Sequence, residues 1–168
     1  MPVTGSVSEI PEGPLVDGAW LEANLRNARV RVLDVRGRHP SSPLPHAKHA
    51  EYLRAHIPGA AFVDWEHDFV AVDDPVPVQV VGAREFADRA AALGVGDGDL
   101  VVTYDDYYGI FAARIAWAFR LYGAESRVLD GGWTTWREQH RPVTDERTDP
   151  AQARVTTRLR PRLRRTLT

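Results

Sequence analysis

Short apolar runs alternate with amphipathic stretches through most of the chain, a pattern that predicts alternating strands and helices. Apolar runs predict buried strands over residues 30–36, 61–64, 100–104 and 127–129. Apolar residues at helical spacing predict helices over residues 17–25, 51–54, 83–93 and 111–122, and around 133–136. This alternation is typical of βα crossovers. We therefore expect one α/β domain with a mainly parallel central sheet flanked by helices on both faces.

Three segments show no regular hydrophobic period and are expected to lie outside these elements. Residues 1–14 are small and polar, which predicts a loose lead-in, and residues 144–168 form a basic tail. Residues 37–50 are rich in proline, serine and histidine and predict an irregular excursion. The domain itself is therefore expected to span residues 15–143.

The chain has no pattern that predicts a metal ion or another cofactor. The histidines of the irregular excursion, His39, His46 and His49, lack a regular ligand spacing, so we expect no metal site there. The chain contains no cysteine, which excludes disulfides, thiolate metal sites and catalysis by a cysteine. Any chemistry must therefore rest on other side chains.

The formal net charge of −2 is distributed unevenly along the chain. Residues 149–168 hold six arginines and one aspartate and carry +5, so residues 1–148 carry −7. An acidic body is poorly suited to nucleic acid, and we interpret the tail as a solvated or artefactual terminus. The chain also lacks an apolar run near the roughly 20 residues that cross a bilayer, and a secretory leader pattern. We expect a cytoplasmic protein that binds neither nucleic acid nor membrane.

Candidate site residues gather where the predicted strands end. Asp34 and Arg36 end the first long strand, and His56 precedes an Ile-Pro-Gly turn. The loop over residues 104–111 follows another strand, begins with Tyr104, Asp105 and Asp106, and leads into a helix. Backbone N–H groups converge at such a loop, and the helix end favours negative charge. This loop is the first candidate for a functional site.

Four ordered blocks of the sequence together resemble the rhodanese-like domain, and in particular the amino-terminal half of the tandem thiosulfate and 3-mercaptopyruvate sulfurtransferases. The blocks are residues 32–36 (VLDVR), 56–60 (HIPGA), the loop with the helix that follows it, and 129–136 (LDGGWTTW). The resemblance covers about residues 15–143. It implies a single rhodanese-like fold and a sulfurtransferase ancestry.

The resemblance also implies what the chain lacks. Family chemistry uses a Cys-x-x-Gly loop, in which a thiolate at the head of a helix carries a sulfane sulfur as a persulfide. Alignment on Gly109 places Asp106 at the cysteine position, and a carboxylate cannot form a persulfide. In the tandem enzymes the second domain carries the cysteine. We therefore expect a non-catalytic amino-terminal domain whose partner, a carboxy-terminal catalytic rhodanese domain, is missing here.

Individual residues of the site admit a functional and a structural interpretation. We favour Asp106 as an acceptor of the loop's own N–H groups over Asp106 as a nucleophile, with Asp105 the weaker candidate of the two. We expect Asp34 and Arg36 to form a structural pair at the strand end. His56 is expected to tie down its turn, although in the mercaptopyruvate branch a histidine at this motif contributes to the inter-domain site.

The aromatic residues of the loop leave a second class of function open. Tyr107, Tyr108 and Phe111, with Ile110 between them, are bulky enough to fill the anion cradle. Exposed, they would instead mark a surface for a protein partner, as in a stand-alone rhodanese-like binding module. An apolar face left open by a missing second domain also predicts self-association. An aspartate-based hydrolase that uses Asp106 is the remaining alternative, and a truncated or frameshifted reading frame would explain the missing half.

Overall fold

The structure is a computed structural model that describes residues 9–164, and its centre is a five-stranded parallel sheet. The strand order is β1-β5-β4-β2-β3, and every neighbouring pair is parallel. The strands are β1 (Leu15–Val16), β2 (Val30–Asp34), β3 (Ala61–Phe62), β4 (Leu100–Tyr104) and β5 (Glu125–Leu129). The predicted fold class is confirmed. The short edge strand β1, which pairs with β5, was not predicted.

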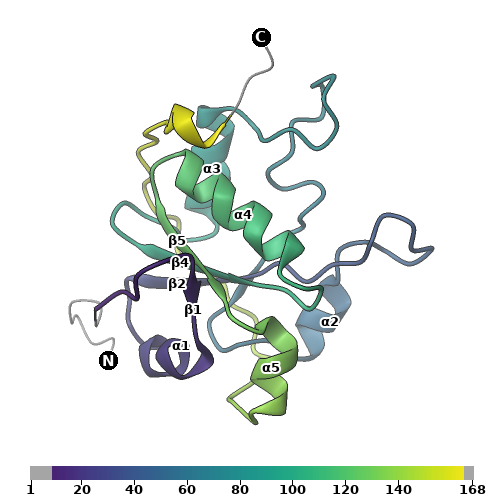
Figure 1. Cartoon of the computed structure of the whole chain (residues 1–168), viewed down its shortest axis with the longest axis vertical. Coiled ribbons are helices and arrows are strands. Elements are labelled where there is room, and N and C mark those ends of the chain that lie inside the picture. The colour runs from purple at the N-terminus through teal and green to yellow at the C-terminus, as the bar shows by residue number, and fades with distance from the viewer. Residues whose placement is uncertain (1–8, 165–168) are drawn as a thin grey trace.

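Helices cover both faces of this sheet (Figure 1). The helices are α1 (Gly18–Asn24), α2 (His49–Arg54), α3 (Ala83–Ala92), α4 (Ile110–Leu121) and α5 (Gly132–Glu138), with a 3₁₀ turn η1 (Pro161–Leu163). The buried side chains of α3 and α4 join one core cluster, and those of α1, α2 and α5 join the other. Successive residues of β2 divide between the two clusters, as the alternation of side chains along a strand requires.

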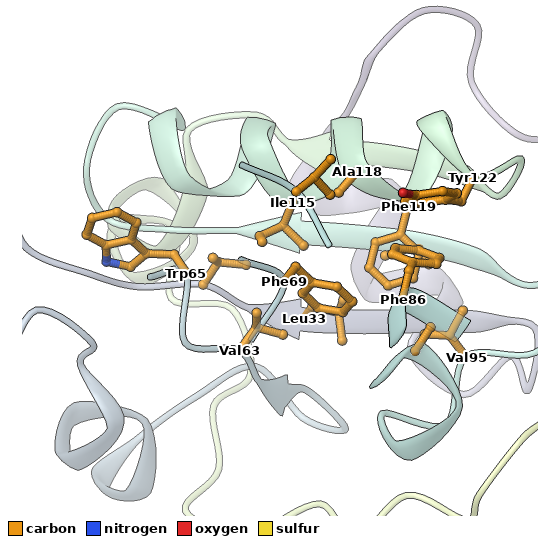
Figure 2. Close-up of a cluster of buried hydrophobic side chains, with 14 of the residues drawn as sticks. Leu33, Val63, Trp65, Phe69, Phe86, Val95, Ile115, Ala118, Phe119 and Tyr122 are labelled. Atoms are coloured by element: carbon orange, nitrogen blue, oxygen red, sulfur yellow. The ribbon is translucent and has the colours of Figure 1, made fainter. Parts of the chain in front are cut away.

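The larger core cluster lies between the sheet and the helices α3 and α4 (Figure 2). Its aromatic rings pack closely, with Phe86 and Phe119 edge to face at a centroid distance of 5.0 Å and Phe86 and Tyr122 tilted at 4.6 Å. The apolar stripe of α4 ends at Gly123, whose φ of +93° is a conformation that favours glycine. This packing places α4, and therefore the loop before it, against the sheet.

The basic tail is docked on the domain along its described part. Backbone hydrogen bonds join Ala153 to Ala91 (3.1 Å), Arg158 to Tyr122 (2.8 Å) and Arg160 to Leu121 (2.7 Å). Val155 also packs against the larger core cluster. The interpretation of this segment as a solvated terminus is therefore wrong for the backbone of residues 149–164, which follows α3 and α4. Most of its side chains, the arginines among them, are exposed.

Within the described residues, the structure contains no helix long and apolar enough to cross a bilayer.

Candidate functional site

The loop between β4 and α4 lies at the carboxyl end of the sheet, as the strand-to-helix pattern predicts. β4 ends at Tyr104 and α4 begins at Ile110, and the loop between them holds Asp105, Asp106 and Gly109. A second turn, residues 130–132, follows the neighbouring strand β5. The backbone N–H of Trp133 donates to the carbonyl oxygen of Asp105 at 2.8 Å, which joins the two turns.

Asp105 occupies the centre of the loop and accepts its converging N–H groups. One carboxylate oxygen accepts from Tyr107 and Gly109, and the other accepts from Phe111 and Ala112, all at 2.9 Å. The residue is 2% exposed, so these four bonds form away from solvent. Charge-assisted bonds of this kind are about twice as strong as neutral ones. An anion already occupies the cradle that the loop and the helix end create.

The expectation that Asp106 fills this role is wrong, because Asp105 takes the N–H groups. Asp106 instead pairs with Lys48, whose ammonium nitrogen lies 2.6 Å from its Oδ2. The other oxygen, Oδ1, is buried and has no hydrogen-bond partner among the described residues. Both side chains are largely buried, with 16% of Asp106 and 20% of Lys48 exposed. The side chain that the resemblance places at the cysteine position is therefore one member of an ion pair.

The two tyrosines of the loop have different environments. The ring of Tyr107 stacks with Phe111 at 5.7 Å and packs against the larger core cluster. Tyr108 has a φ of +57°, which is unusual for a residue with a side chain, and is 94% exposed. The expectation that the aromatic residues fill the anion cradle is wrong, because Asp105 is already there. Tyr108 and the 57% exposed Ile110 form an apolar projection beside the loop.

A groove of about 870 Å³ lies between the loop, the turn over residues 130–132 and the edge strand β1. Asp105, Asp106 and Asp130 are among its lining residues, and no lysine, arginine or histidine of the described residues lines it. Tyr108 and Leu15 also line it. The groove thus combines apolar and acidic character, the opposite of a site that attracts a small anion.

Asp34 and Arg36 form a buried ion pair behind the loop. The guanidinium nitrogen Nη2 of Arg36 lies 2.8 Å from Oδ2 of Asp34, and the residues are 3% and 0% exposed. Burial by itself would lower the pKa of Arg36, but the charge and hydrogen bonds of Asp34 raise it overall. The guanidinium carbon also lies 4.1 Å from the ring centroid of Trp133, which links β2 to α5.

Tyr104 completes this buried group from the end of β4. Its hydroxyl donates to Oδ2 of Asp34 at 2.5 Å and accepts from the N–H of Ile57 at 3.2 Å. Burial raises the pKa of Tyr104 well above its ordinary value, and the nearby charge of Asp34 raises it further. The hydroxyl is therefore a fixed donor that supports the Asp34 carboxylate, and the group joins three strand and loop segments.

His56 is fully buried and both ring nitrogens contact backbone carbonyl oxygens. Nδ1 lies 2.7 Å from the carbonyl oxygen of Tyr52, and Nε2 lies 2.8 Å from that of Glu146. The backbone of His56 also exchanges two hydrogen bonds with Thr144. The residue thus joins α2 to the segment that follows α5, and both of its ring nitrogens are engaged by backbone carbonyl oxygens.

The other histidines of the irregular excursion do not gather. Nδ1 of His46 lies 2.9 Å from a carboxylate oxygen of Glu66, His39 contacts Ser41, and His49 packs beside Phe62. Among residues 9–164, the structure contains no group of three or more side chains that could hold a metal ion. None of these histidines reaches the loop at Asp106 through a hydrogen bond or ion pair within that part of the chain.

Sequence reasoning underestimated two residues of the site. Asp105 directly follows a strand and precedes a glycine-terminated loop, a pattern in which a short carboxylate often accepts nearby N–H groups. That local signal was available. Lys48 lies 58 residues from Asp106, and its only distinction in the sequence is that it is the single lysine. No local pattern predicts their contact.

Comparison with known proteins agrees with this geometry. The family model described as the rhodanese-like domain matches residues 17–139. Thiosulfate sulfurtransferase from Bos taurus is 36% identical over 148 residues, which are 83% of this chain and 48% of the bovine protein. The sulfur carrier protein TtuD from Thermus thermophilus is 34% identical over 133 residues, covering 79% of this chain and 42% of TtuD.

Solved structures show the same fold. SseA from Escherichia coli, described in a study of 3-mercaptopyruvate sulfotransferases, superposes with a TM-score of 0.80 at 24% identity. The superposition covers 88% of this chain and 56% of SseA. The chain spans about half the length of the relatives that it matches.

Proposed function

Because the chain belongs to the rhodanese-like domain family, we propose that it is the non-catalytic amino-terminal domain of a thiosulfate or 3-mercaptopyruvate sulfurtransferase. The observation that carries this proposal is the state of the loop. Asp106 stands where the family places its cysteine, and Asp105 accepts four of the N–H groups that would stabilise an anionic sulfur. Persulfide chemistry at this loop is thus prevented for two reasons: a carboxylate replaces the thiol, and the N–H groups that would stabilise a thiolate are already bound.

The groove beside the loop supports a partner domain in place of a substrate. Thiosulfate is an anion, and the groove offers Asp106 and Asp130 but no basic side chain among the described residues. The exposed Tyr108 and Ile110 at its side are suited to contact with another protein surface. In this proposal a catalytic rhodanese domain with a Cys-x-x-Gly loop docks against this face, and this chain serves as one wall of the cleft.

The first test is the sulfurtransferase activity of the purified chain. Thiocyanate formation from thiosulfate and cyanide is expected to equal the no-enzyme control. Turnover above that control would contradict the proposal. The coding DNA after codon 168 provides the second test, because it is expected to encode a rhodanese domain with a Cys-x-x-Gly loop.

Co-expression with that second domain tests whether the face at Tyr108 is the surface on which the second domain docks. Tyr108→Asp is expected to weaken association of the two domains and to lower thiocyanate turnover. Val72→Asp is the matched control, because Val72 is 82% exposed but does not line the groove. Equal effects of the two variants would show that the face at Tyr108 is not the contact.

A stand-alone binding module is the second candidate, and the projection of Tyr108 and Ile110 favours it. In this case a specific protein partner is expected to bind the purified chain and to be lost on Tyr108→Ala with Ile110→Ala. The same exposed face supports self-association, which size-exclusion chromatography measures. If the chain elutes as a monomer at all concentrations and binds no specific partner, both the binding module and the self-association would be contradicted.

A further inference from the structure

Three arginine side chains surround a second hollow at the opposite end of α4 from Asp106. The hollow has a volume of about 510 Å³, and its lining residues are Arg120, Glu125, Arg160, Pro161, Arg162 and Leu163. Arg120 belongs to the last turn of α4, and the other arginines belong to the docked tail at η1 (Figure 1). Segments about 40 positions apart in the chain thus create one basic site.

The backbone that carries these arginines is held in place. The N–H of Arg160 donates to the carbonyl oxygen of Leu121 at 2.7 Å, and the indole N–H of Trp117 donates to that of Leu163 at 2.9 Å. These contacts place both ends of η1 against α4. The side chains of Arg160 and Arg162 are exposed, so the guanidinium groups are positioned by the backbone but free to bind.

The charge of the hollow is not neutralised by the protein. Glu125 is its one lining carboxylate, and this residue already accepts from Nη1 of Arg127 at 3.2 Å and lies 3.7 Å from Nη2 of Arg160. Arg120 and Arg162 make no ion pair within residues 9–164. Three guanidinium groups against one shared carboxylate leave an excess of positive charge, in a chain whose first 148 residues carry −7. A multivalent anion would relieve the repulsion among them.

We propose that this hollow binds a small multivalent phosphate, such as a polyphosphate or a phosphorylated metabolite. The guanidinium fork of arginine matches two phosphate oxygens at once, and such paired bonds are short and strong. Pro161 and Leu163 supply apolar walls that reduce competition from water. The site is independent of the proposed sulfurtransferase role, since it shares no lining residue with the groove at Asp106.

The dimensions and the charge of the surroundings favour a small ligand over nucleic acid. Nucleic acid binding rests on neutralising many successive phosphates along an extended basic surface. Here the net positive charge lies in the tail that lines the hollow, whereas residues 1–148 carry a net charge of −7. A compact ligand with two or three phosphate groups can contact the three arginines and meets one lining carboxylate, that of Glu125.

Isothermal titration of the full chain with inorganic triphosphate tests the proposal. We expect one ligand per chain, and Arg160→Gln with Arg162→Gln is expected to weaken binding at least about tenfold. The matched control is Arg54→Gln with Arg84→Gln, which removes the same charge from exposed positions on α2 and near the start of α3. We expect the control pair to change the affinity less than about twofold.

A second variant tests whether the double variant weakens binding only because the tail has detached from α4. Arg120→Gln lies on α4 and leaves the backbone contacts of η1 intact, so it is expected to weaken triphosphate binding while the Trp117 indole N–H resonance keeps its position. Three outcomes would overturn the proposal: triphosphate fails to bind, both double variants lose affinity equally, or a single-stranded RNA binds more tightly than triphosphate. The last result would assign the surface to nucleic acid.

Discussion

The ammonium nitrogen of Lys48 lies 2.6 Å from Oδ2 of Asp106, and this ion pair joins the irregular excursion to the loop that follows β4. In the proposed function Asp106 takes the family's cysteine position, and this residue is held by a cation from a distant part of the chain. The N–H groups nearby are bound to Asp105 and do not point to Asp106. The loop is thus tied together by its own backbone and by one distant cation.

Asp106→Cys is expected to restore the nucleophile's side chain without restoring sulfur transfer. The amides that would lower the pKa of a thiol at this position are occupied by Asp105. In a background with Lys48→Met, which removes the ammonium group 2.6 Å from Asp106, the thiol is therefore expected to titrate near the ordinary value of about 8.5. The pH dependence of alkylation by iodoacetamide measures this, and the thiosulfate and cyanide assay is expected to stay at background. An alkylation midpoint well below neutral pH would show that the loop still activates a thiol.

Asp105→Asn is expected to destabilise the chain more than Asp106→Asn. The neutral amide of asparagine keeps one oxygen acceptor, but its NH₂ group faces two backbone N–H donors, and the charge that strengthens the four bonds is lost. We expect the free energy of unfolding to fall by about 2–4 kcal/mol. Asp106→Asn removes the charge from one ion pair but keeps an oxygen that can accept from Lys48, and a smaller cost of about 1 kcal/mol is expected. Urea unfolding of both variants measures the free energies, and the reverse order would contradict the role given to Asp105.

Tyr104→Phe is expected to lower the free energy of unfolding at neutral pH. At high pH the variant is expected to lose less stability than the wild type. Removing the hydroxyl leaves Asp34 without one donor, which costs about 1–2 kcal/mol. The folded state raises the pKa of Tyr104 above its ordinary value of 10.0, so the unfolded state releases this proton first as pH rises. The contribution is complete below pH 10 and falls as pH rises toward the higher folded-state pKa.

The measurement is unfolding free energy against pH for the wild type and for two variants. The wild type is expected to lose stability above about pH 10 more steeply than Tyr104→Phe. Tyr108→Phe is the matched control, because its hydroxyl is on a 94% exposed side chain. If Tyr104→Phe and the wild type show the same slope, Tyr104 ionises equally in both states.

Gly132→Ala is expected to be more harmful than Gly59→Ala, although both glycines have positive φ. Gly132 has a φ of +56°, and a Cβ there would lie 2.4 Å from the carbonyl oxygen of Asp105. Gly59 has a φ of +81° and nothing within 4 Å of an added Cβ, so it isolates the backbone strain. We expect about 2–4 kcal/mol at Gly132 and about 1 kcal/mol at Gly59 by thermal or urea unfolding. Equal losses would show that the close approach to Asp105 is not rigid.

The elements that the sequence predicts well have strong local patterns. The apolar run that forms β4 and the helical period of α4 each extend over several residues. The run is typical of a strand buried on both faces, and the period is typical of a helix buried along one face. The two-residue strand β1 has no such period and forms because β5 offers it an edge. The docked tail escaped prediction for a similar reason, since the backbone bonds that hold it to α3 and α4 are encoded by no side-chain pattern and Val155 alone gives no period.

By itself, the sequence determined the α/β fold, the rhodanese-like motifs and the absence of a cysteine, because each depends on residue type or on short periodic spacing. Only the tertiary structure decided which aspartate fills the cradle, since Asp105 and Asp106 are chemically identical and differ in the direction that the backbone gives their side chains. It also decided that Lys48 meets Asp106, because ion pairs between distant segments follow from packing. The sequence motifs thus predicted where the site lies in the fold. The contacts among its side chains were decided by the tertiary structure.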